Sequence, residues 1–126
     1  MRRVFFYWTP VLFYMFSVFL ASVDPRPPKL PLIWGMDKIA HFAAYAVMGL
    51  LWARALRSGA NRAGGFKAFR RVVLAVVVVA LFGAFMEVCQ MYVPGRSAEE
   101  LDALANGLGG FLGVLIHERV GYRGRR

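Results

Sequence analysis

The chain has 126 residues and a net charge of +9, and 59% of its residues are hydrophobic while only 18% are charged. A soluble domain of this size has too few polar groups to cover so much apolar surface, and long uncharged runs are typical of membrane proteins. The basic residues lie between and after these runs, so we expect contact with anionic membrane lipids and no nucleic-acid partner.

Four apolar runs predict an all-α, polytopic membrane protein, a bundle of four transmembrane helices at residues 4–23, 36–56, 72–93 and 101–116. A span needs roughly 20 apolar residues, and a signal-peptide core only about 7–15, so we interpret the first run as an uncleaved anchor. The proline-rich segment 24–35 and the basic segment 57–71 are predicted loops. Residues 1–126 therefore form a single membrane domain.

The distribution of basic residues predicts that both termini lie in the cytoplasm, because cytoplasmic loops carry an excess of Lys and Arg. In this orientation 12 of the 16 basic residues fall inside, and four fall outside, namely Arg26, Lys29, Lys38 and Arg96. The predicted location is the bacterial inner membrane, crossed several times.

Polar residues recur at helical spacing near the outer ends of three predicted spans. In the second span, Lys38, His41 and Tyr45 stand at positions i, i+3 and i+7, with Asp37 beside them. Because residues three, four and seven apart share one face of a helix, these three side chains should point the same way.

The third and fourth spans carry matching stripes. The third has Ala80, Gly83, Glu87 and Gln90 on one face, and the fourth begins with Asp102 and Asn106, four residues apart. Between them, Pro94-Gly95-Arg96-Ser97 has the composition of a tight turn, and Ser97 or the acidic residues after it are candidates to cap the next helix. A charged group inside a span costs about 2.5–3.5 kcal/mol on insertion scales, so Glu87 should face the bundle interior or a wet cavity.

This convergence predicts a polar site at the outer face of the membrane. Lys38 and Arg96 suit a phosphate or carboxylate, and His41, Glu87 and Asp102 are the candidates for proton transfer. The competing interpretation is structural: the same groups can hydrogen-bond or form ion pairs across helices, Glu87 with Arg96 or Lys38. One histidine with scattered carboxylates does not specify a metal, so we expect neither a metal nor a cofactor. His117, at the opposite end, is expected to be a solvated side chain.

Small residues mark one face of the fourth span. Ala105, Gly109 and Gly113 follow at four-residue spacing. Such a stripe allows two helices in lipid to approach closely, so we expect the fourth helix to press against a partner span.

Residues from about 36 to 114 resemble the VanZ-like family. The resemblance rests on an ordered set of positions: Asp37-Lys38, His41, Tyr45, Glu87, Gln90, Pro94-Gly95-Arg96, Asp102, Asn106 and Gly109-Gly110. It implies a small bacterial membrane protein of the cell envelope. Through the family's namesake, it also implies a link to low-level resistance to the glycopeptide antibiotic teicoplanin.

Three functions are compatible with these observations. In the first, the chain binds an anionic envelope lipid or a lipid-linked cell-wall precursor. The predicted binding residues are Lys38, His41, Tyr45, Glu87, Gln90, Arg96, Asp102 and Asn106. Alternatively, it is a membrane enzyme that acts on such a molecule through His41 and Glu87, or a structural subunit of an envelope complex. A homo-oligomer is compatible with the sequence, which does not require one.

Overall fold

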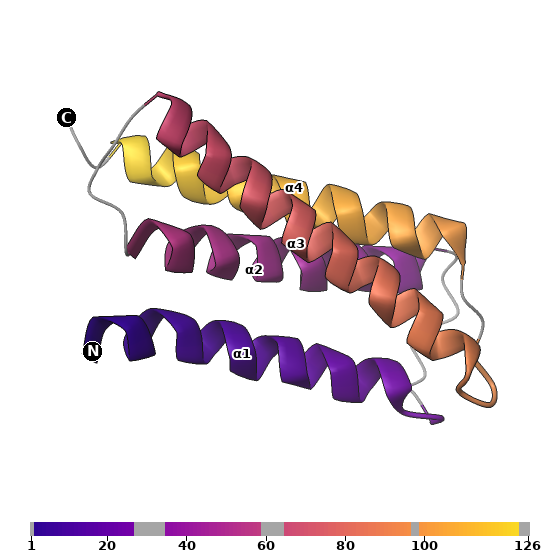
Figure 1. Ribbon diagram of the computed structural model, residues 1–126. Coiled ribbons are helices and arrows are strands. Elements are labelled where there is room, and N and C mark those ends of the chain that lie inside the picture. Colours follow the sequence, from indigo (N-terminus) through magenta and orange to yellow (C-terminus); the bar gives the residue numbers. More distant parts are fainter. Residues whose placement is uncertain (1, 27–34, 59–64, 97–98, 124–126) are drawn as a thin grey trace.

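The computed structural model describes residues 2–26, 35–58, 65–96 and 99–123, and all regular structure in these segments is helical. The four helices are α1 (Arg2–Val23), α2 (Met36–Ser58), α3 (Phe66–Met91) and α4 (Glu100–Arg123). They run alternately in opposite directions, so that the start of α1 and the end of α4 lie at the same end of the bundle (Figure 1). The prediction of an all-α protein is confirmed.

The helices extend beyond the predicted spans. α3 begins at Phe66, six residues before the apolar run at 72, and α4 continues to Arg123, seven residues past residue 116. A helix satisfies its backbone hydrogen bonds in water as well as in lipid, so it need not end where the apolar run ends. Most of the proline-rich loop, residues 27–34, lies outside the described residues, as do residues 59–64 and 97–98.

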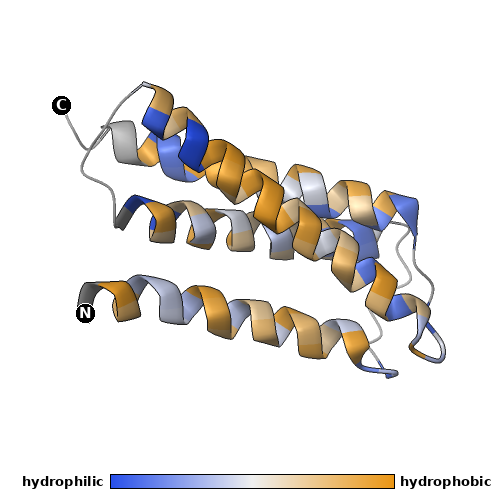
Figure 2. Cartoon of the chain, in the orientation of Figure 1, coloured by the Kyte–Doolittle hydropathy of each residue, from blue (hydrophilic) through white to orange (hydrophobic). Residues whose placement is uncertain are grey.

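In the described part of the chain, three helices are long and apolar enough to cross a membrane: Val4–Val23 in α1, Met36–Arg57 in α2 and Phe66–Met91 in α3. Large apolar side chains are exposed along their outer surfaces, among them Phe5 (75% exposed), Phe13 and Leu81. Figure 2 shows that hydrophilic residues gather toward the two ends of the bundle, with a largely hydrophobic middle. An apolar surface of this extent is unfavourable in water and suits a lipid environment.

α2 and α3 each pack against all of the other three helices, with α2 making the more extensive contacts, whereas α1 and α4 do not touch within the described residues. The closest partner of α2 is α4. A Cβ atom added at Gly109 would collide with the backbone carbonyl of Phe42, and one added at Gly113 with that of Ala46. The predicted close approach of the fourth helix to a partner is thus confirmed, and the partner is α2.

α1 docks on α2 mainly through aromatic groups. The rings of Trp8 and Trp52 meet edge to face at 5.2 Å between centroids, and the Arg54 guanidinium lies 4.8 Å from the centroid of the Tyr7 ring. Further along, the Tyr14 hydroxyl donates to the carbonyl oxygen of Ala44 at 3.0 Å. These contacts hold α1 against α2 from Ala44 to Arg54.

Candidate functional site

A tight turn brings Arg96 onto the end of α1. The backbone N–H of Arg96 donates to the Val93 carbonyl at 3.1 Å, and Gly95 supplies the positive φ of 81° that this turn requires after Pro94. The Arg96 guanidinium then donates from Nη2 to the Ala21 carbonyl at 2.6 Å and from Nε to the Asp24 carbonyl at 3.3 Å. A helix C-terminus has unpaired carbonyls and a partial negative charge, so an arginine stabilises it.

Lys38 is held by carboxylates near the start of α2 and near the start of α4. Its Nζ lies 2.5 Å from Asp37 Oδ2 and 3.0 Å from Asp102 Oδ1, and it also pairs with Glu99. Three negative groups therefore surround the single ammonium. This arrangement fastens the start of α2 to the start of α4 and leaves Lys38 less available to an external anion than the sequence suggested.

A hydrogen-bonded chain connects α2, α4 and α3 in the bundle interior. Asn106 Nδ2 donates to Glu87 Oε1 at 3.1 Å, and Asn106 Oδ1 lies 3.0 Å from His41 Nδ1. His41 Nε2 is 3.8 Å from Asp102 Oδ2. Asn106 thus bridges two of the three groups predicted to move protons, His41 and Glu87, and Glu87 pairs with it instead of with Lys38 or Arg96.

This network is buried. Glu87 is 7% exposed, Asp102 6% and Asn106 1%. Within the described part of the chain, Glu87 Oε2 and the Tyr45 hydroxyl have no hydrogen-bond partner. Buried polar groups in folded proteins almost always have partners, so these two atoms are exceptions.

Of the predicted stripe on α3, Gly83, Glu87 and Gln90 are buried as expected. Ala80 is exposed, and Val79 is buried in its place. The face predicted for α3 is therefore correct near its C-terminal end and shifts by one residue toward the middle of the helix.

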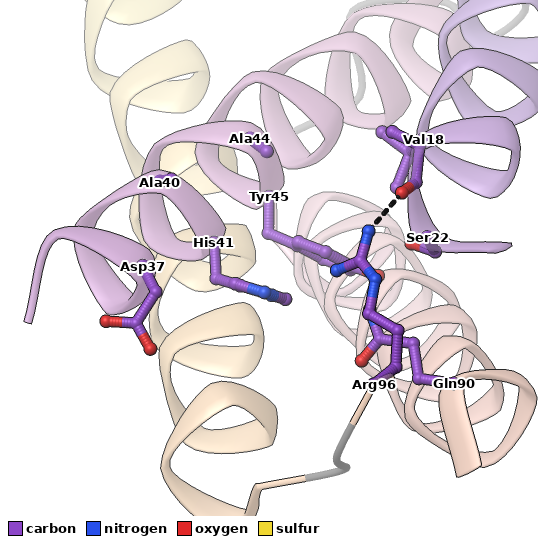
Figure 3. Close-up of a pocket in the computed structure, with 10 residues that line it drawn as sticks. Val18, Ser22, Asp37, Ala40, His41, Ala44, Tyr45, Gln90 and Arg96 are labelled. Atoms are coloured by element: carbon purple, nitrogen blue, oxygen red, sulfur yellow. Dashed lines mark hydrogen bonds between the residues drawn. The ribbon is translucent and has the colours of Figure 1, made fainter. Parts of the chain in front are cut away.

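A cavity of about 470 Å³ lies between the end of α1, the start of α2 and the end of α3. Val18, Ala21, Ala40 and Ala44 form apolar walls, and polar groups contribute from Ser22, Asp37, His41, Tyr45, Gln90 and Arg96. Figure 3 shows the His41 and Tyr45 side chains pointing from α2 into this space, with Arg96 across it, reaching toward α1.

The sequence had not assigned any residue of the first helix to the site. Val18, Ala21 and Ser22 line the cavity, and Asp37 and Glu99 surround Lys38. Ser22 is a polar residue near the end of a largely apolar run, and this was the available signal. Ser97 lies outside the described residues.

His117 lies near the end of α4, at the opposite end of the bundle from His41. Its side chain is only 17% exposed, and Nδ1 is 3.7 Å from Glu118 Oε1. The expectation of a solvated side chain was therefore wrong, because most of the side chain is covered.

A family model described as VanZ/LLP1 matches residues 2–120. The match includes α1 and the proline-rich segment, and so extends well beyond residues 36–114, on which the sequence resemblance rested. No curated protein and no solved structure matches the chain significantly.

Proposed function

We propose that this chain, which belongs to the VanZ/LLP1 family, binds an anionic envelope lipid or a lipid-linked cell-wall precursor in the cavity beside α1. The observation that carries this proposal is the position of Arg96, a cation at the edge of a cavity whose walls are largely apolar. An amphiphile with a negatively charged headgroup has the matching chemistry. Its tail would lie along α1 and α2, and its headgroup would face the guanidinium.

The cavity has a suitable size and lining. Ligand pockets commonly measure about 300–1,000 Å³ and combine apolar walls with a few polar groups, as this one does at about 470 Å³. The small side chains Ala21, Ala40 and Ala44 leave the width that an acyl or isoprenoid chain would occupy.

Arg96 retains donors for a headgroup. A guanidinium has five N–H donors, and the bonds to Ala21 and Asp24 use two of them. The remaining donors can bind phosphate oxygens, which arginine recognises well. Because three carboxylates engage Lys38, we assign the main anion contact to Arg96.

Replacing Arg96 should weaken lipid binding strongly. A hydrogen bond to a charged group contributes about 1.5–3 kcal/mol, so Arg96→Ala should lower affinity roughly 10- to 150-fold. Native mass spectrometry of the detergent-purified protein with extracted envelope lipids would measure the retained adduct. Arg70→Ala, at the opposite end of the bundle where the side chain is exposed, is the matched control and should keep the adduct.

A second pair of variants tests the cavity without touching Arg96. Ala40→Trp should fill it and exclude the lipid, while Ala43→Trp, on an exposed position of the same helix outside the cavity, should not. Equal adducts on folded wild-type, Arg96→Ala and Ala40→Trp proteins would contradict the proposal and favour a structural subunit.

We also propose that α4 crosses the inner membrane with the other three helices, and that both termini are cytoplasmic. Two observations support this orientation. α4 runs parallel to α2 and packs along it, with apolar side chains such as Leu104, Leu108 and Ile116 exposed. The basic residues lie 12 to 4 in favour of the cytoplasmic side.

Topology reporters test this arrangement directly. Fusions at residue 62 and after residue 126 should report the cytoplasm, and a fusion within segment 24–35 should report the outside. A cytoplasmic signal from segment 24–35 would rule out the proposed orientation, and opposite signals from the other two fusions would show that α4 does not cross.

A second candidate function is enzymatic. The observation that favours it is the chain from His41 through Asn106 to Glu87, which links an imidazole that lines the cavity to a buried carboxylate. In that case Glu87→Gln should abolish turnover of the bound lipid while the adduct remains. The link to teicoplanin resistance stays a prediction.

A further inference from the structure

The interior polar network contains a set of potential metal ligands from three helices. His41 of α2, Glu87 of α3 and Asp102 of α4 each offer one ligand atom, and these atoms lie within 4.8 Å of one another. The three residues are far apart in sequence, so only the packing of the helices assembles them.

The burial of this set distinguishes it from an acidic surface cluster. Glu87 and Asp102 are more than nine-tenths buried, and Glu87 Oε2 has no hydrogen-bond partner within the described residues. An isolated buried carboxylate oxygen is unfavourable unless a proton, a donor or a cation satisfies it. The second acidic group, of Asp37, Glu99 and Asp102, already has Lys38 as its cation.

Asn106 orients two of the three ligands. A carboxylate that binds a metal is ionised and only accepts hydrogen bonds, so in the metal-bound state the amide –NH₂ of Asn106 faces Glu87 and its oxygen faces His41 Nδ1. His41 then carries its proton on Nδ1, and the lone pair of Nε2 is directed toward the side of Asp102 Oδ2. A metal-bound histidine typically shows this arrangement, with its second nitrogen donating to an oxygen nearby.

The local charge also favours a cation. With all groups ionised, Asp37, Glu87, Glu99 and Asp102 contribute −4 and Lys38 contributes +1, a sum of −3. A divalent cation would reduce this to −1. Lys38 lies on Oδ1 of Asp102, and Oδ2 on the other side of that carboxylate remains directed toward His41.

We propose that His41, Glu87 and Asp102 bind one divalent transition-metal cation of the zinc or manganese class. Imidazole and carboxylate ligands suit these ions, and three protein ligands leave a coordination position for water or a ligand. Because His41 also lines the cavity beside α1, that position would border the cavity. This site is independent of the proposed lipid binding.

Only a small movement of side chains is needed to bring the three ligand atoms to the spacing of a metal site. Zinc holds oxygen and nitrogen ligands at about 2.0–2.2 Å, so neighbouring ligand atoms in a tetrahedral site are roughly 3.4 Å apart. The 3.8 Å between His41 Nε2 and Asp102 Oδ2 is close to this spacing. Rotation of the Glu87 and Asp102 side chains can supply the difference.

Metal binding is measured on the full-length protein in detergent, purified without a polyhistidine tag and stripped with a chelator. After incubation with Zn²⁺ or Mn²⁺ alone and desalting, elemental mass spectrometry should find about one equivalent of metal per chain. His41→Gln and Glu87→Gln should each weaken binding at least tenfold, and Asn106→Ala by about 10- to 100-fold, the usual effect of losing a group that orients a ligand. His117→Gln, which changes the histidine at the other end of the bundle, should bind as wild type does.

Cobalt provides a second measurement. Bound Co²⁺ should give a visible absorption spectrum in the wild type and the His117→Gln variant, and His41→Gln should abolish it. His41 is partly exposed, so this variant should fold even if Glu87→Gln does not. Less than a tenth of an equivalent on the wild type, or equal binding by wild type and His41→Gln, would overturn the metal site. Neither result would bear on the lipid adduct, which is measured with Arg96 and Ala40 variants.

Discussion

Gly109→Ala and Gly113→Ala should each destabilise the protein by about 3 kcal/mol or more, at the upper end of what overpacking costs. At both positions the new methyl group would meet backbone atoms of α2, those of Phe42 and Ala46 respectively. A backbone in the middle of a helix cannot rotate away as a side chain can. The two helices would have to separate, and the contact between α2 and α4 is the most extensive in the bundle.

Gly107→Ala is the matched control for these variants. A Cβ at Gly107 meets no atom within 4 Å, so the change should be neutral or stabilise the helix by up to about 1 kcal/mol. Helix content during denaturation with sodium dodecyl sulfate would report the three free energies of unfolding. If Gly109→Ala and Gly113→Ala are as stable as Gly107→Ala, α2 and α4 do not pack through these glycines.

Asn106→Ala should destabilise the bundle by about 2–4 kcal/mol. The change removes the partners of His41 Nδ1 and Glu87 Oε1 together, and an unpaired buried polar group costs about 1–3 kcal/mol. Because Glu87 is buried, water has little access to replace the lost donor. The same denaturation experiment measures the effect.

Two further variants isolate the role of Asn106. Leu108→Ala truncates an exposed side chain on the same helix and should change the free energy of unfolding by no more than about 0.5 kcal/mol. Combining Asn106→Ala with Glu87→Gln should give less than the sum of the two effects, because the two groups interact directly. A loss for Asn106→Ala no greater than for Leu108→Ala would show that the bridge contributes nothing to stability.

Arg96 and Lys38 differ in how far they are available to bind an external anion. Arg96 and Lys38 were both expected to bind an anion, but they are placed differently. Lys38 is surrounded by three carboxylates, whereas Arg96 uses two of its five donors on α1. A substitution of Lys38 should therefore act mainly on how α2 is joined to α4.

The sequence was sufficient to identify the helices and the end of the bundle at which the polar groups gather. Long apolar runs form helices in lipid because no other backbone can satisfy its hydrogen bonds there. Once the helices alternate in direction, residues near corresponding ends must lie at one level, which is why Lys38, His41, Glu87, Asp102 and Asn106 were expected together. The glycine stripe of α4 followed from spacing alone. The residue at which α3 begins could not be predicted in this way, since a helix can continue past its apolar run.

The partners within the site depended on the tertiary structure. Helical spacing gives the face on which a side chain lies, but the rotation and offset of each helix against its neighbours decide which atoms meet. Those quantities follow from close packing, such as the contact of Gly109 and Gly113 with α2. This packing sets Asn106 between His41 and Glu87, directs Arg96 to the carbonyls of α1, and opens the cavity that α1 completes. Each of these contacts joins residues at least 19 positions apart, a separation over which local periodicity carries no information.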